Sequence, residues 1–241
     1  MKTKDLIFII IFIIIVIPFL PFPFLQHFQQ SFLYNEEYWI PTSFIKFAFL
    51  ATMGEIIGLR IRTGNYYETG FGLLPRMVVW GFLGLMIKIS FVVFGAGIPI
   101  LIEKCFWIKG ANQSMVYSDY FDAASQGLGG VRLLSAFLIS TFMNITFAPV
   151  MMTFHKITDI HITQQGGSFI KFFKPIPFRK IFPAINWDVQ WNFIFKKTIP
   201  LFWIPMHTIT FLVASQYRVV IAAFLGIVLG AILSFAGRKK N

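Results

Sequence analysis

Three ionisable residues stand inside long apolar runs of the sequence, namely Glu55, Lys88 and His207. An ionisable side chain at the centre of a bilayer costs about 2.5–3.5 kcal/mol on insertion scales, so such residues usually face a bundle interior or a wet cavity. We therefore predict a polar seam of these three residues, with Thr210 close to the histidine. Two interpretations of Glu55 are open: a packing carboxylate that pairs with a cation such as Lys88, or a carboxylate that lines a polar pathway.

The remaining polar residues offer little catalytic chemistry. His155 and Asp159 are four residues apart and His161 is near, but we interpret them as a solvated interfacial turn rather than a catalytic dyad. The sequence has no phosphate-binding glycine loop with its lysine, no H-x-x-x-H pair and no acidic cluster of metal-ligand spacing. A single cysteine, Cys105, excludes an internal disulfide framework. We predict no enzyme, no cofactor and no metal site.

The composition indicates a membrane protein. The 241 residues are 56% hydrophobic and only 13% charged, with a mean hydropathy of +0.71. Soluble domains are about 25% charged, so this chain has too few charges to cover a globule. The formal net charge is +11, but lysines and arginines such as Lys2, Lys4 and Lys239 flank apolar runs, as they do when charge sets membrane topology. We therefore do not predict nucleic-acid binding.

Six segments are long and apolar enough to be read as transmembrane helices, which need about 20 residues. If the N-terminus is inside, most of the 21 lysines and arginines fall on the inner side, and the acidic 26–42 loop falls outside. We predict an all-α bundle of six spans with both termini inside. A cleaved signal peptide is the alternative for the first span, but its apolar run is long and lacks a small-x-small cleavage site. The six spans are 6–25, 43–61, 76–101, 131–154, 198–215 and 219–237.

The chain divides into four parts by this pattern: an N-terminal anchor helix (1–26), the second to fourth spans (43–154), a basic inner-face segment (155–197) and the last two spans with a basic C-terminus (198–241). The segment 155–197 interleaves Phe and Trp with Lys and Arg, and its prolines argue against one long helix. We expect it to meet anionic lipid, either as a subdomain or lying flat on the membrane.

The last span contains a G-x-x-x-G pattern, formed by Gly226 and Gly230. Small residues four apart on an apolar helix let another helix approach closely. The pattern therefore predicts a helix–helix contact. Whether the contact lies inside one bundle or joins two copies in a homo-oligomer is left open.

Three stretches resemble motifs of the Mpv-seventeen / peroxisomal membrane protein twenty-two family of small multi-spanning proteins: ATMGEIIGLRI, FAPVMMTFHKITD and WIPMHTITFLVASQYR. The resemblance covers about half of the chain. Glu55 stands where the family has Asp, and His207 where it has Gln. The first and third spans have no counterpart in the family's usual four-span architecture. The other positions that align with the family motifs are Gly54, Pro149, Phe154, His155, Asp159, Trp203, Thr210, Phe211, Tyr217 and Arg218.

The resemblance implies a helical bundle with a pore or metabolite-permeability role. We accordingly expect a channel-like protein or one involved in small-solute permeability. The alternative is a structural or assembly protein that binds lipid or a partner and has no solute path. The two differ in whether the polar residues converge on one wet cavity. A composition rich in Phe, Ile and Lys favours a bacterial cytoplasmic membrane over a mitochondrial or peroxisomal one.

Overall fold

A computed structural model of the chain describes residues 3–20 and 22–238, with side chains as far as residue 232. Helices are the only regular secondary structure in this part of the chain. Lys2, Lys239 and Lys240, which the topology prediction counts on the inside, lie outside the described residues. The helices are α1 (Thr3–Val16), η1 (Ile17–Phe19), η2 (Pro23–Leu25), α2 (Gln26–Phe28), η3 (Gln29–Leu33), η4 (Glu36–Tyr38), α3 (Trp39–Thr63), α4 (Leu73–Cys105), α5 (Ala111–Val116), α6 (Tyr120–Ser125), α7 (Gly129–Gln164), α8 (Phe169–Phe172), α9 (Phe178–Ile181), η5 (Phe182–Ala184), α10 (Trp187–Val189), η6 (Gln190–Trp203), α11 (Ile204–Leu212) and α12 (Ser215–Arg238).

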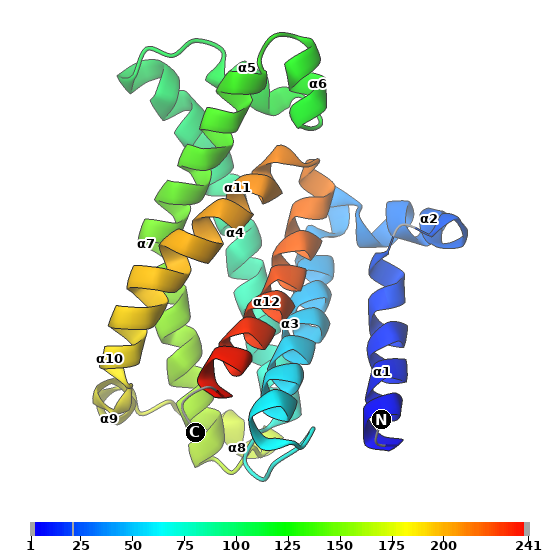
Figure 1. Ribbon diagram of the computed structural model, residues 1–241, viewed down its shortest axis with the longest axis vertical. Coiled ribbons are helices and arrows are strands. Elements are labelled where there is room, and N and C mark those ends of the chain that lie inside the picture. Colours follow the sequence, from blue (N-terminus) through cyan, green and yellow to red (C-terminus); the bar gives the residue numbers. More distant parts are fainter. Residues whose placement is uncertain (1–2, 21, 239–241) are drawn as a thin grey trace.

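The long helices form one bundle (Figure 1). Helix α3 packs against α4 and α12, while α7 packs against α4 and α11. Short helices cover both ends: α5 and α6 lie at one end, and α8 and α9 at the other (Figure 1). Helix α1 stands beside the bundle, and its Asp5 forms an ion pair of 2.7 Å with Arg60 of α3. The core between the helices is apolar and includes Leu50, Phe91 and Phe211.

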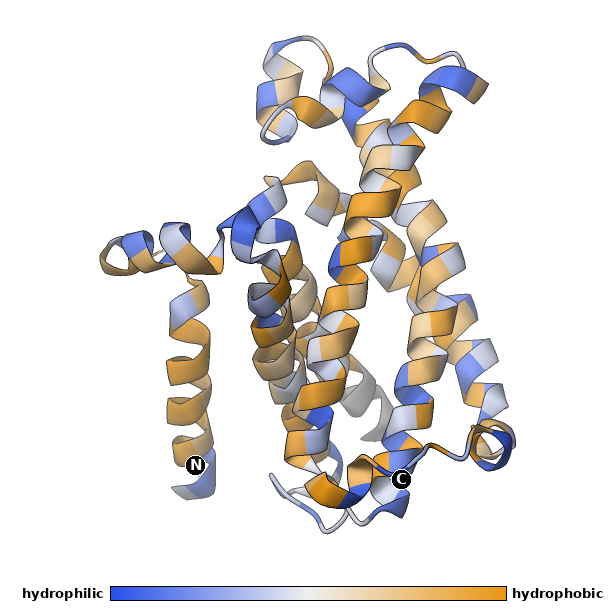
Figure 2. Ribbon diagram, turned by 180° about the vertical axis from the view of Figure 1, so that it is seen from behind, coloured by the Kyte–Doolittle hydropathy of each residue, from blue (hydrophilic) through white to orange (hydrophobic). Residues whose placement is uncertain are grey.

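Several helices are long and apolar enough to cross a membrane. They are α4, α7 and the residues Ser215–Ile232 of α12. A fourth candidate is a broken pair, Thr3–Phe19 and Pro23–Leu33, whose two parts are bent by 65°. Apolar residues dominate the middle of the long helices (Figure 2), and many of them point outward. These features are compatible with a multi-pass membrane protein.

Two of the six expected spans differ from this set. The segment 43–61 lies within α3, where Lys46, Glu55 and Arg60 lower the hydropathy of the helix. The segment 198–215 is divided between η6, of 14 residues, and α11, of 9 residues. Neither of these two helices alone has the length of about 20 residues that a span requires.

Helix α7 extends further than the expected fourth span, which ends at residue 154. It continues to Gln164 and is followed by Gly166 and Gly167, whose φ angles of 65° and 72° favour glycine. His155 and Asp159 therefore lie on a long helix and not in the basic inner-face segment. The rest of that segment consists of short helices, in keeping with its prolines.

The G-x-x-x-G pattern of α12 meets α3 of the same chain. A Cβ atom on Gly54 would lie 2.9 Å from Ile227 Cα and 3.1 Å from Gly226 O. A Cβ atom on Gly230 would lie 3.0 Å from Gly54 O. The two backbones approach so closely that neither Gly54 nor Gly230 has room for a side chain.

We predict that Gly54→Val lowers the stability of the bundle by about 1–3 kcal/mol, because the added carbons force α3 and α12 apart. Thermal unfolding of the purified protein in detergent, followed by circular dichroism, measures the effect. The matched control is Gly97→Ala on α4, where a Cβ meets no heavy atom within 4 Å. The control should melt at or slightly above the wild-type temperature. Equal melting temperatures for Gly54→Val and wild type would contradict the close contact.

Candidate functional site

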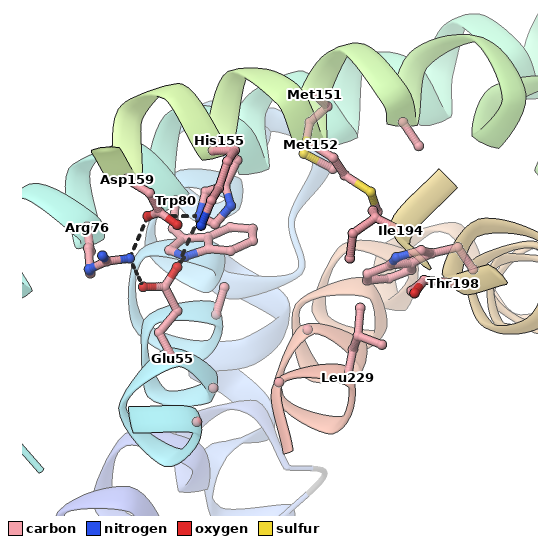
Figure 3. A pocket seen from close by; sticks show the side chains of 18 of the residues that line it. Glu55, Arg76, Trp80, Met151, Met152, His155, Asp159, Ile194, Thr198 and Leu229 are labelled. Carbon is pink, nitrogen blue, oxygen red and sulfur yellow. Dashed lines mark hydrogen bonds and ion pairs between the residues drawn. The ribbon is translucent and has the colours of Figure 1, made fainter. Parts of the chain in front are cut away.

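Five side chains from three helices meet near the α8 end of the bundle (Figure 3). Glu55 comes from α3, Arg76 and Trp80 from α4, and His155 and Asp159 from α7. Arg76 and Trp80 are four residues apart, as are His155 and Asp159. Residues at this spacing share one face of a helix, so α4 and α7 each present two polar groups to the same cluster.

Glu55 is the centre of this cluster. Arg76 Nη1 donates to Glu55 Oε2 and, at 2.5 Å, to Asp159 Oδ1. Trp80 Nε1 donates to Glu55 Oε1 at 2.7 Å. His155 Nε2 lies 3.0 Å from the same oxygen, and this geometry places a proton on that nitrogen. One carboxylate thus binds donors from both other helices.

The charges of the cluster nearly cancel. Two carboxylates, Glu55 and Asp159, share the single guanidinium of Arg76. One negative charge is in excess, and an imidazolium on His155, whose Nε2 lies 3.8 Å from Asp159 Oδ1, would neutralise it. The four charged or ionisable side chains are between 11% and 21% exposed. They are therefore mostly withdrawn from solvent but still line an accessible space.

That space is a cavity of about 750 Å³ between α3, α4, α7, η6 and α12. At its mouth lie the exposed residues Arg62, Lys156 and Gln164, next to the charged cluster. Its middle is apolar and includes Met152 of α7, Ile194 of η6 and Leu229 of α12 (Figure 3). This cavity is called the inner cavity below.

His207 lies at the deep end of the inner cavity, together with Asn144. Asn144 Nδ2 lies 3.0 Å from His207 Nδ1 and also donates to Ser140 O at 2.8 Å. An amide donor at Nδ1 leaves the ring proton on Nε2, so the pair corresponds to a neutral imidazole. The Trp203 ring stacks on the histidine with its centroid 5.1 Å away. His207 is thus held by an interhelical hydrogen bond at the boundary of a cavity.

The structure brings Glu55 and His207 to one cavity but places Lys88 elsewhere. The expected pairing of Lys88 with Glu55 is absent, because Lys88 Nζ binds Glu36 Oε2 at 2.7 Å. Lys88 lies three turns beyond Arg76 on α4, which carries it toward the other end of the bundle. Thr210 is fully buried, and its hydroxyl donates to Met206 O at 2.9 Å.

The residues of the family resemblance are distributed over the bundle. Pro149 lies inside α7, and Phe154 on the same helix is 41% exposed. Phe211 is fully buried against Phe91, at a centroid distance of 5.0 Å. Tyr217 packs edge-on against a tyrosine of the N-terminal part, and Arg218 Nε donates to a backbone carbonyl.

Three residues of the site escaped the sequence analysis: Arg76, Trp80 and Asn144. Arg76 is the first residue of the expected third span, 76–101, and Trp80 lies within that span. The available signal was the four-residue spacing of Arg76 and Trp80, which matches that of His155 and Asp159. The interpretation of the latter pair as a solvated turn does not fit the contact of His155 with Glu55 or the ion pair of Asp159 with Arg76.

Three side chains of the cluster could also be ligands of a metal ion. One possible ligand atom each of Glu55, His155 and Asp159 lies within 4.8 Å of the others. Arg76, however, already occupies the position between the two carboxylates. A metal cation would have to displace this guanidinium, so the donor set fits an ion-pair network better than a metal site.

We predict that Glu55→Leu lowers the unfolding free energy by about 3–5 kcal/mol, because it leaves the charges and donors of α4 and α7 without their acceptor. Glu55→Gln should cost less, because its amide oxygen can still accept from Trp80. Thermal unfolding in detergent measures both. The matched control is Glu37→Gln, an exposed carboxylate whose loss should leave stability unchanged. A Glu55→Leu variant as stable as Glu37→Gln would show that the network does not stabilise the bundle.

Comparison with known proteins adds no relative: no family model matches the chain, and no curated protein or solved structure matches it significantly. The resemblance to the Mpv-seventeen / peroxisomal membrane protein twenty-two family therefore stays a prediction from the residues quoted above.

Proposed function

We propose that this protein lets small polar solutes cross a membrane through the inner cavity. The observation that carries the proposal is that Glu55, Arg76, His155, Asp159 and His207 all line one cavity. Polar residues with only a structural role would be expected to pair off in dry contacts between helices. The resemblance to the Mpv-seventeen family points to the same class of function.

A second pocket supports a continuous path. It has a volume of about 280 Å³ and lies between α4, α5 and α12, with the exposed residues Asn112 and Ser215 at its rim. This pocket is called the outer pocket below. On α4 the inner cavity ends at Ile87, and the outer pocket begins at the adjacent Lys88. The two spaces approach each other from opposite ends of the bundle.

Phe91 is the side chain that separates the two spaces. It lines the outer pocket, and its ring meets His207 of the inner cavity edge-on, at a centroid distance of 5.6 Å. On its other side it packs against Phe211. We infer that Phe91 closes the path in this structure and that its displacement would open it.

We predict that Phe91→Ala raises solute flux into proteoliposomes several-fold, because it removes the ring between the two spaces. Met152→Trp should lower flux several-fold, because the larger side chain fills the middle of the inner cavity. Flux assays with ions and metabolites of graded size measure both effects.

The control for these variants is Val150→Trp on α7, which is 69% exposed and lines neither space. Its flux should equal that of the wild type. If all three variants behave alike while remaining folded, the cavity is no solute path, and a structural or assembly role is favoured instead.

We also propose six membrane crossings with both termini inside. Helices α1, α3, α4, α7 and α12, together with the η6–α11 pair, run alternately up and down the bundle (Figure 1). The start of α1 and the end of α12 lie at the α8 end, where the basic segment also lies (Figure 1). Concentrated lysine and arginine favour the inner side of a membrane.

We predict that a membrane-impermeant maleimide added from outside labels the exposed native Cys105, at the α5 end. In a Cys105→Ser background, Lys174→Cys should be labelled only in inside-out vesicles. Labelling of both positions from one side would contradict the topology.

The Lys174→Cys variant also tests contact with anionic lipid. Its labelling should slow in anionic liposomes and recover in high salt. A labelling rate that does not depend on lipid charge would contradict contact of this segment with anionic lipid.

A further inference from the structure

The outer pocket is rich in positive charge. Its polar lining consists of Lys88 from α4, Asn112 from α5, and Ser215 and Arg218 from the start of α12. All four side chains are hydrogen-bond donors, and two of them are cations. The pocket lining contains no carboxylate.

Two more buried cations lie near the pocket without lining it. Lys46 is 4% exposed and is close enough to Lys88 for their like charges to repel, and the same holds for the fully buried Arg132 and Arg218. Of these four cations, only Lys88 forms an ion pair with a described residue, and its partner Glu36 is 52% exposed. Three of the four cations therefore form no ion pair among the described residues.

Two further carboxylates, Asp119 and Asp122, attract Arg132 but form no ion pair with it among the described residues. Asp119 also caps α6 by accepting from Asp122 N, and Asp122 accepts from Ser118 N. Lys46 lies over the Tyr34 ring, with its Nζ 4.9 Å from the centroid. Burial raises the pKa of Tyr34 to about 12, so its hydroxyl stays neutral at physiological pH. It supplies no negative charge to Lys46.

Backbone carbonyls hold the two arginines without neutralising them. Arg132 Nη2 and Arg218 Nη2 both approach Phe211 O, at 3.4 and 3.5 Å. Arg132 Nη1 also donates to Ser114 O at 2.6 Å, while its buried Nε has no partner among the described residues. A carbonyl oxygen carries a dipole but no net charge. Four cations therefore face three carboxylates, Glu36, Asp119 and Asp122, and only Glu36 forms an ion pair with one of them among the described residues. A buried cation without an ion-pair partner is costly.

We propose that the outer pocket binds a phosphate group. A phosphate offers several acceptor oxygens and negative charge to the arginine, lysine, amide and hydroxyl donors of the lining. The N-terminus of the 24-residue α12 adds its dipole to the same potential. Both a free phosphate and the headgroup phosphate of an anionic lipid have this chemistry. The pocket lies at the outer end of the proposed path, but binding is measured separately from flux, so either can fail alone.

The test is a calorimetric titration: inorganic phosphate is added to the full-length protein in a non-ionic detergent and a phosphate-free buffer, and the heat of binding is measured. A parallel arm adds phosphatidylglycerol in mixed micelles. Lys88→Gln should weaken binding about tenfold, because it removes one charge-assisted hydrogen bond. Glu36→Gln should strengthen binding, because it frees Lys88 from its half-exposed partner. Lys104→Gln, an exposed cation at the end of the same helix, should leave binding unchanged.

The outcomes separate the two sources of phosphate. Binding of inorganic phosphate with this order of variants supports a free-anion site. Binding of phosphatidylglycerol alone, with the same order, supports a lipid headgroup site. Absence of binding in both arms overturns the proposal, as does binding that Lys88→Gln and Lys104→Gln change equally. Arg218→Gln is a further variant, and Lys88→Gln and Glu36→Gln carry the test if its lost carbonyl contacts impair folding.

Discussion

The arrangement of the helices depends on the hydrogen bonds and ion pairs that the carboxylate of Glu55 forms. It joins α3 to Arg76 and Trp80 of α4 and to His155 of α7, and Arg76 extends the network to Asp159. In an apolar environment a charge cannot be satisfied by bulk water, so its partners must come from the protein. Supplying those partners fixes the relative rotation of three helices about their axes.

The same constraint explains how α3 can belong to the bundle although it is less apolar than its neighbours. Its charged residues at the α8 end have partners, since Glu55 binds α4 and α7, and Arg60 binds Asp5 of α1. On its face toward α12, Gly54 lets the two backbones come into contact. Mean hydropathy considers a helix in isolation. It therefore underestimates how well a helix fits an apolar bundle when neighbouring helices supply partners for its polar groups.

The sequence predicted the all-helical class and several apolar spans, because both follow from composition and the length of apolar runs. It also singled out Glu55 and His207, since a polar residue in an apolar run is visible without a structure. It could not identify their partners. Arg76 and Asp159 are separated by 83 residues, and Lys88 and Glu36 by 52. Helical periodicity shows which residues share a face, but not which faces meet, and so the sequence left open whether Lys88 pairs with Glu55.

The two spaces differ in how their charges are balanced. At the inner cavity, Glu55 and Asp159 lie against Arg76 and His155, and this cluster is close to neutral. At the outer pocket, the lining residues Lys88 and Arg218 are cations, and Glu36 is the ion-pair partner of Lys88. A solute that passes between the two spaces would move from the nearly neutral cluster of the inner cavity to the outer pocket, which favours anions, or in the opposite direction. Phe91 stands at this boundary, so the proposed closure lies where the electrostatic environment changes, and the outer pocket would decide which solutes reach it.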